Sequence, residues 1–149
     1  MTQDARAFNW DSIPVKTGVT ANPAPNANPV GFTVPASKRY LLTALEFTLV
    51  TDANVANRTI SCVIAMDGTN NYMYVTTTTA QTATMTRYYR FDLLKTYGET
   101  YSGGFYMTGL GLMNGLELPA GAVVTFAIAS RQVGDDATAT TYLYKEAPA

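Results

Sequence analysis

The sequence predicts an all-β chain, an antiparallel β-sandwich with jelly-roll connectivity that follows an extended N-terminal arm. From residue 32 onward, apolar and polar side chains alternate with a period of two almost everywhere. Clusters of Gly, Pro, Asn and Asp divide the alternating runs into seven or eight short segments, and no window carries the apolar stripe of a helix. A length of 149 residues is that of one domain.

The first part of the chain differs from the rest in composition. Its prolines stand among asparagine and alanine without any period, which favours an extended arm over residues 1–30 before a β domain at 31–149. Phe8, Trp10 and Ile13 lie on a stretch too short to bury them by itself. Two interpretations remain open: these residues fold back onto their own domain as an edge strand, or they dock on a neighbouring copy or a larger partner.

Turn-forming residues separate the expected strands of the β domain. They are expected in the run after residues 34–37 and at residues 58–66, 72–76, 84–91, 106–113, 123–130 and 140–145. In the first of them Leu41, Thr43, Leu45, Phe47 and Leu49 share one face. This alternation predicts that the strand is half buried.

Cys62 belongs to the second of these strands. It alternates with Ile60, Ile64 and Met66, so it is expected in the core as a small hydrophobic residue rather than as a reactive thiol. The stretch "DGTNN" at residues 67–71 has hairpin-turn chemistry and leads into the returning strand.

Two phrases occur twice in the chain. "VPAS" at residues 34–37 and "LPAG" at 118–121 each stand just before a strand, where a proline can end one segment without interrupting a hydrogen-bond ladder. Downstream, "VTDANVAN" at 50–57 resembles "VGDDATAT" at 133–140. Two similar strand–loop units suit the paired Greek keys of a jelly roll, although such corners also recur by chance in β proteins.

The composition excludes most reaction chemistry. The chain has no histidine and one cysteine, so it can form neither an intrachain disulfide nor a histidine-based catalytic triad. We therefore expect no enzymatic activity, no cofactor and no metal site. Asp135 and Asp136 are adjacent and are interpreted as turn formers, because neighbouring side chains of a strand point to opposite faces.

The charge distribution bears on partners. The formal net charge is -1 and charged residues make up 14% of the chain, so we expect binding to neither nucleic acid nor membranes. The N-terminus has no hydrophobic signal core, which predicts synthesis in the cytoplasm. A surface with so few charges is expected to be covered by neighbouring subunits.

The tyrosines are the candidate contact residues. Tyr72 and Tyr74 alternate on one strand, as do Tyr142 and Tyr144 on the last one, and both pairs are expected to point outward. Together with Phe8, Trp10 and Ile13 they form the predicted partner interface. Ordinary strand packing, a protein interface and sugar stacking remain alternative interpretations of these phenols.

Several phrases resemble proteins of a known kind. "VPASKRYLLTALEFTLVTDANVANR", "AQTA" at residues 80–83 and the closing "LPAG…GDD…YLYKE" are similar to short virion proteins of tailed bacteriophages, over residues 33–146. The resemblance implies a non-enzymatic capsid decoration or cement subunit on the virion surface. It further implies the major capsid protein and other copies of the chain as partners, with a homotrimer as the expected assembly. A carbohydrate-binding module and a tail, fibre or connector component are the alternatives.

Overall fold

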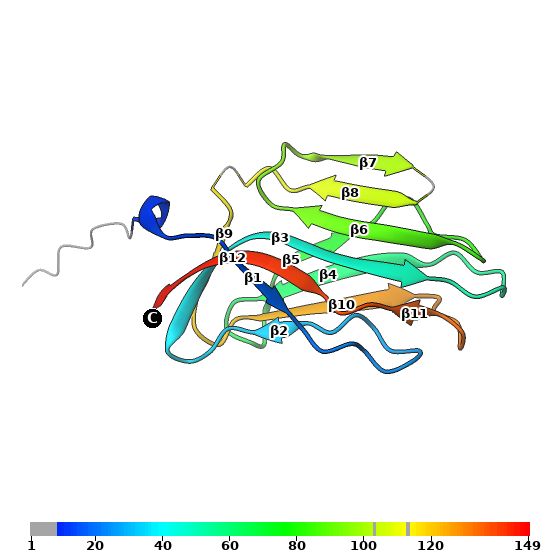
Figure 1. Cartoon of the computed structure of the whole chain (residues 1–149), viewed down its shortest axis with the longest axis horizontal. Helices are drawn as coiled ribbons and strands as arrows, with labels where there is room; N and C mark the ends of the chain where they lie inside the picture. The colour runs from blue at the N-terminus through cyan, green and yellow to red at the C-terminus, as the bar shows by residue number, and fades with distance from the viewer. Residues whose placement is uncertain (1–8, 103, 113) are drawn as a thin grey trace, which may run out of the picture.

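The computed structural model describes residues 9–102, 104–112 and 114–149. These residues form two β-sheets that pack against each other (Figure 1). The large sheet contains β1 (Lys16–Val19), β12 (Thr141–Pro148), β3 (Lys38–Val50), β6 (Thr86–Asp92), β8 (Phe105–Gly109) and β7 (Gly98–Ser102), with β9 (Leu116–Leu118) and β11 (Asp136–Ala137) also paired to β3. The small sheet contains β2 (Phe32–Thr33), β10 (Val123–Ala129), β4 (Thr59–Ala65) and β5 (Asn71–Thr76). The predicted all-β sandwich is confirmed.

The order of the strands shows how the chain moves between the layers. The large sheet runs β1-β12-β3-β6-β8-β7 and the small sheet runs β2-β10-β4-β5. Neighbouring strands are antiparallel, except that β6 and β8 are parallel. Strands β7, β8 and β9 all lie between β6 and β10 in the sequence. Of these, β8 and β7 extend the large sheet beyond β6, whereas β9 pairs with β3.

The core lies between the sheets and combines aliphatic with aromatic side chains. Phe47 of β3 stacks on Tyr89 of β6 with ring centroids 5.4 Å apart and meets Phe126 of β10 edge-on at 5.3 Å. Cys62 is 3% exposed within the same core, as predicted. Burial raises the pKa of its thiol to about 12, so the thiolate is disfavoured at neutral pH.

An irregularity in the long strand β3 changes the face on which its side chains lie. Leu143 pairs with Ala44, but the next residue of β12, Tyr144, pairs with Leu42. The extra residue, Thr43, donates its hydroxyl hydrogen to the carbonyl oxygen of Leu143 at 3.0 Å. As a result Leu42 belongs to the core between the sheets. The prediction that Leu41 and Thr43 share the core face with Leu45 was wrong for this reason.

The two repeated corners lie beside each other. The amide of Val34 donates to the carbonyl oxygen of Ala122, and the amide of Gly121 donates to that of Val34, both at 2.9 Å. Gly121 has a positive φ of 81°, a conformation that favours glycine at this turn. Strands β3 and β10 therefore start from one joint, and each enters a different sheet.

Part of the N-terminal region belongs to the large sheet. Strand β1 pairs with residues 141–144 of β12, as in the interpretation that folds this region back onto its own domain. Beyond it, Asn22 and Asn28 accept hydrogen bonds from the amides of Ala139 and Ile128 at 2.9 and 3.0 Å. The expectation of an extended arm over residues 1–30 was therefore wrong for the stretch from β1 to Asn28. Removal of β1 would expose the edge of β12.

Candidate interaction surfaces

The tyrosines of β5 form the most exposed aromatic pair on a strand of the small sheet. Tyr72 and Tyr74 are 64% and 65% exposed, whereas Met73 and Val75 between and after them pack against the core. This is the predicted orientation. The Tyr74 hydroxyl lies 3.0 Å from Oγ of Ser61, which holds that ring in place while its face remains open. Strand β5 is the last strand of its sheet, so the pair stands at an accessible edge.

The tyrosines of β12 point the other way. Tyr142 and Tyr144 pack against the core cluster, and their rings lie 4.1 Å from Phe32 and 4.3 Å from Tyr40. A Cβ atom on Gly18 of β1 would lie 2.1 Å from the Tyr142 ring, so this glycine leaves the space that the ring fills. The expected outward orientation of these two tyrosines was wrong.

The reason for the inversion is that both faces of β12 carry apolar side chains. Tyr142 lies opposite Leu45 and Tyr144 opposite Leu42, which are core residues of β3. Leu143 lies on the outer face instead, where it lines a pocket with Val15. A "YLY" pattern alternates correctly in either orientation, and only the pairing with β3 decides between them.

The N-terminal aromatic residue contacts its own domain. Trp10 begins the short 3₁₀ turn η1 (Trp10–Ser12), and its indole N–H donates to Oε2 of Glu117 at 3.3 Å. The guanidinium of Arg39 lies 5.8 Å from the indole ring, and Lys145 Nζ donates to the Trp10 carbonyl oxygen at 2.8 Å. Ile13 is half-buried at the end of this turn. Phe8, the third predicted contact residue of this region, lies outside the described residues.

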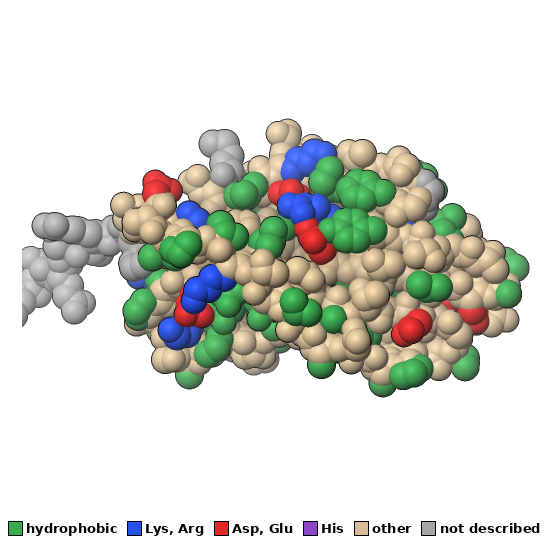
Figure 2. Space-filling view, in the orientation of Figure 1, with side chains coloured by type: hydrophobic (Ala, Val, Ile, Leu, Met, Phe, Trp, Pro, Cys, Tyr) green, Lys and Arg blue, Asp and Glu red, His purple; other side chains and the backbone are tan. Residues whose placement is uncertain are grey.

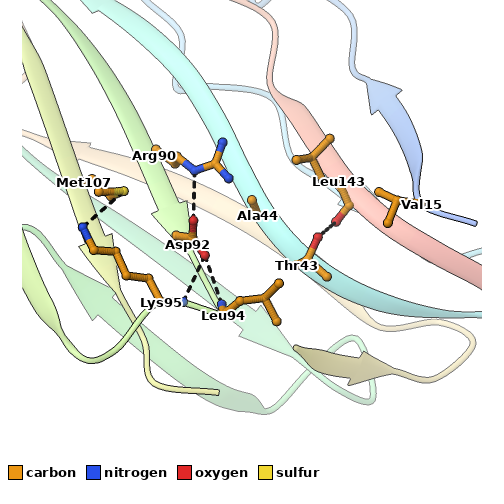
Figure 3. Close-up of a pocket in the computed structure, with 9 residues that line it drawn as sticks. All are labelled: Val15, Thr43, Ala44, Arg90, Asp92, Leu94, Lys95, Met107 and Leu143. Carbon is orange, nitrogen blue, oxygen red and sulfur yellow. Dashed lines mark hydrogen bonds and ion pairs between the residues drawn. The ribbon is translucent and has the colours of Figure 1, made fainter. Parts of the chain in front are cut away.

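A pocket of about 550 Å³ opens on the outer face of the large sheet (Figure 3). Its lining residues are Val15, Thr43, Ala44, Arg90, Asp92, Leu94, Lys95, Met107 and Leu143. Arg90 pairs with Glu46 and, at 3.1 Å, with Asp92, so the polar rim is largely neutralised from within. The pocket therefore suits an apolar side chain of a partner better than a charged ligand.

The surface around the pocket is also largely apolar. Figure 2 shows hydrophobic side chains spread over this face; basic and acidic groups lie together near its middle and on its left side, and acidic groups alone lie at its right end. One of the aromatic pairs is Tyr88 and Phe105, stacked with centroids 5.7 Å apart. Burial, with the nearby Glu46, raises the pKa of Tyr88 to about 12, so this phenol stays neutral.

A buried ionic cluster joins the two loops whose sequences resemble each other. Arg58 and Asp135 are 0% and 1% exposed, and two hydrogen bonds of 2.9 and 2.8 Å connect guanidinium and carboxylate. Arg58 also donates to Oδ1 of Asp52 at 2.6 Å and to the carbonyl oxygens of Asn54 and Ala56, each at 2.9 Å. Every N–H direction of the guanidinium thus meets an acceptor.

The role of Asp135 goes beyond that of a turn former. It accepts a hydrogen bond from the amide of Gln132, as in a turn, and another from the amide of Asp52 in the other loop. Burial acts to raise the pKa of Asp135, but the hydrogen bonds and the charge of Arg58 outweigh it and hold the pKa below its ordinary value. Sequence reasoning missed this cluster, although the repeated phrases align Asp52 with Asp135 and so contained the signal.

The hairpin between β4 and β5 has the predicted geometry. Oδ1 of Asp67 accepts from the amides of Thr69 and Asn70 at 2.8 and 2.7 Å, and these hydrogen bonds lower the pKa of Asp67 to about 2. Among the residues described by the structure, no group of three or more acidic or cysteine side chains is placed to hold a metal ion. Within the same ranges, no helix is long and apolar enough to cross a bilayer.

Comparisons with known proteins give little further information. No family model matches the chain, and no curated protein is similar to it. A solved structure with a related outline is a chain of the T13 IBDV viral particle, whose crystal structure is described as revealing a missing link in the evolution of icosahedral viruses. The similarity covers 88% of this chain and 30% of that one, with 9% identity and a TM-score of 0.37. Similarity at this level establishes neither a common fold nor a common function.

Proposed function

We propose that this chain is a non-enzymatic structural protein of a bacteriophage virion, a decoration or cement subunit that binds neighbouring major capsid proteins on the outside of the shell. The observation that carries the proposal is the open pair Tyr72 and Tyr74 on the edge strand of a firmly packed sandwich. Tyrosine is enriched in protein interfaces, because its ring buries apolar area while its hydroxyl remains able to form hydrogen bonds.

The fold also supports a binding role. The two sheets are connected by hydrogen bonds between the turns that precede β3 and β10, so the sandwich is a rigid support. Aromatic side chains on a rigid support lose little conformational entropy on binding. The short phage-like phrases at residues 34–58 and 118–146 direct the proposal toward a virion component. The first of these phrases supplies strand β3, and parts of the second supply β12.

We infer further that the sandwich is a jelly roll. The order β1-β12-β3-β6 in one sheet and β2-β10-β4-β5 in the other supports this, because early and late strands lie side by side in both. A jelly roll has eight strands in two sheets and recurs in viral capsid proteins. The segment with β7, β8 and β9 would then be an insertion between the sixth and seventh strands of the roll.

The test is co-sedimentation with capsids assembled from the major capsid protein of the phage from which the chain would come. Wild-type protein should sediment with the capsids, and Tyr72→Ala with Tyr74→Ala should weaken the apparent affinity at least about tenfold, as for aromatic interface anchors. Val55→Ala and Val133→Ala, at positions 97% and 82% exposed on loops, serve as controls that should leave binding unchanged. Failure of the wild-type protein to sediment with capsids would contradict the proposal.

A carbohydrate-binding module is the second candidate, and the same tyrosines favour it. Two open phenol rings on one strand face could stack on successive sugar rings. Binding of the isolated protein to a glycan array, lost in Tyr72→Ala and combined with indifference to capsids, would establish this alternative. A tail, fibre or connector component would instead be recognised by antibody labelling of whole particles.

A further inference from the structure

The end of the large sheet beyond β6 presents an open strand edge. Strand β7 pairs with β8 on one side only and closes that end of the sheet (Figure 1). All five of its residues are exposed. Its pairing with β8 continues without a register shift from Gly98 to Ser102, and the segment contains neither proline nor lysine. Natural proteins usually protect an exposed edge by such devices or by charged side chains, and Glu99 is the one charged residue of β7.

The other sheet ends differ from this one. Strand β2 has two residues, and β5 pairs with β4 through a register shift near Ala65. Strand β1 carries Lys16, which forms a salt bridge of 3.1 Å with Glu146. Short length, an irregular register and a charged lysine each discourage the addition of another strand. Strand β7 is therefore the edge best suited to pairing.

The side chains of β7 also hold the strand in position. Glu99 accepts hydrogen bonds from the hydroxyls of Thr78 and Tyr106, beside β5 and in β8. The Tyr101 hydroxyl accepts from Arg87 at 3.2 Å, and the guanidinium lies 4.6 Å from the Tyr101 ring. The backbone groups of the free edge are thus already in the conformation that a partner strand requires.

The chemistry of β7 is complementary to itself. If two copies pair antiparallel about Thr100, Glu99 of each copy lies opposite Tyr101 of the other, and Gly98 lies opposite Ser102. Within β7 this register places no like charges opposite each other, and the charge nearest the axis is that of Lys95, whose Nζ lies 3.5 Å from Thr100 Oγ1. Thr–Thr pairs are favourable in antiparallel sheets. A register centred on Glu99 would instead oppose two carboxylates. The register centred on Thr100 is therefore favoured over the one centred on Glu99.

We propose that a second copy of this chain pairs with β7 across a two-fold axis, so that the two large sheets become one continuous sheet. This specifies the surface for the self-association named above, and it requires no capsid. An isologous contact of this kind closes at two copies, which makes the dimer the expected unit in place of a trimer. Backbone hydrogen bonds along the edge supply the affinity, and the opposed side chains fix the register.

The experiment is sedimentation equilibrium of the full-length protein without capsids, over a range of concentrations. Thr100→Lys should weaken dimer formation at least about tenfold, because it adds two ammonium groups at the axis beside Lys95, whose Nζ lies 3.5 Å from Thr100 Oγ1. Thr100→Asp is the matched variant, and it should retain the dimer because Lys95 can neutralise the new carboxylates. Thr17→Lys, on the exposed edge strand β1, should leave the dimer unchanged.

Melting temperatures of the variants verify that each one folds. A wild-type monomer, a trimer, or a dimer that Thr17→Lys weakens as much as Thr100→Lys would overturn the proposal. So would a dimer that Thr100→Lys leaves intact. Capsid co-sedimentation is measured separately. A protein that binds capsids as a monomer would contradict the dimer but not the proposed function. A dimer that does not bind capsids would contradict the proposed function but not the dimer.

Discussion

Two arginines are completely buried among the residues that the structure describes, and their surroundings differ. Arg58 meets the carboxylates of Asp135 and Asp52 at the end of the sandwich. Arg87, the second residue of β6, donates to the carbonyl oxygen of Ala80 at 3.1 Å and lies over the ring of Tyr101. The first environment supplies formal negative charge, and the second supplies backbone dipoles and aromatic faces.

The comparison shows that burial of a guanidinium can serve two different purposes. Arg58 connects two loops that are distant in the sequence, so its partners decide whether that end of the sandwich is ordered. Arg87 fastens β7 and the segment before β6 to the large sheet, and its interactions are spread over several weaker contacts. We therefore expect single substitutions around Arg58 to have larger effects than those around Arg87.

The largest effect is expected from Asp135→Ala. The substitution removes the bidentate partner of a fully buried guanidinium, which typically costs about 3–5 kcal/mol in the free energy of unfolding. Urea denaturation of the purified variant measures this loss. Asp136→Ala is the control. The Asp136 side chain is exposed, so its removal should change the free energy of unfolding by no more than about 0.5 kcal/mol. Equal losses in the two variants would contradict the assigned role of the cluster.

A smaller effect is expected when both charges are removed together. Arg58→Met combined with Asp135→Leu replaces the pair by apolar groups of similar size, and such replacements are often close to neutral. Asp52 is 15% exposed in its side chain and can then be solvated by water. The double variant should be more stable than Asp135→Ala alone. A double variant that is less stable than either single variant would show that the loops require the charges themselves.

The cluster should also make stability depend on pH. The pKa of Asp135 is lowered in the folded state, so the stabilisation is present above the carboxyl pKa of the unfolded chain, about 3.9. It is lost as the pH falls through the lower pKa of the folded state. Thermal melting between neutral pH and the acid limit should therefore show a steeper decline for the wild type than for Asp135→Asn. Parallel curves for the two proteins would contradict this assignment.

The smallest effect is expected at Arg87. Tyr101→Phe removes the hydroxyl that accepts from Arg87 but retains the ring under the guanidinium, so the loss should be on the order of 0.5–1.5 kcal/mol. Tyr97→Phe, at an 84% exposed position, provides the control. A loss after Tyr101→Phe as large as that after Asp135→Ala would remove the distinction between the two arginines.

The sequence was sufficient for the parts of the fold that depend on local pattern. Alternation located β3, β4, β5, β6, β8, β10 and β12, the core position of Cys62 and the outward face of Tyr72 and Tyr74. It did not indicate β7, which lies in a tyrosine- and glycine-rich stretch without alternation, or the short strands β2, β9 and β11. It failed at Tyr142 and Tyr144, because a strand with apolar residues on both faces is oriented by its partner. It failed at β1 as well, since "KTGV" has almost no strand signal of its own and is held by β12.

The buried cluster could not be predicted for a different reason. Arg58 and Asp135 are 77 residues apart in the sequence. The alternation with Ile60 and Cys62 places Arg58 in phase with the core face, but no pattern around Asp135 indicates burial. Charged residues are rarely buried unless they are paired, so the default expectation places both at the surface. Only the similarity between residues 50–57 and 133–140 hinted that their loops form one structural unit.

That pairing of distant loops has a kinetic consequence. Contacts between residues far apart in the chain carry a high loop-closure entropy, so we expect the Arg58 cluster to form after the main folding barrier has been crossed. Interactions that are absent from the transition state leave the folding rate nearly unchanged and slow the unfolding rate instead. The Arg58 cluster should therefore act mainly on the lifetime of the folded chain, a property that matters most where a protein has no opportunity to refold.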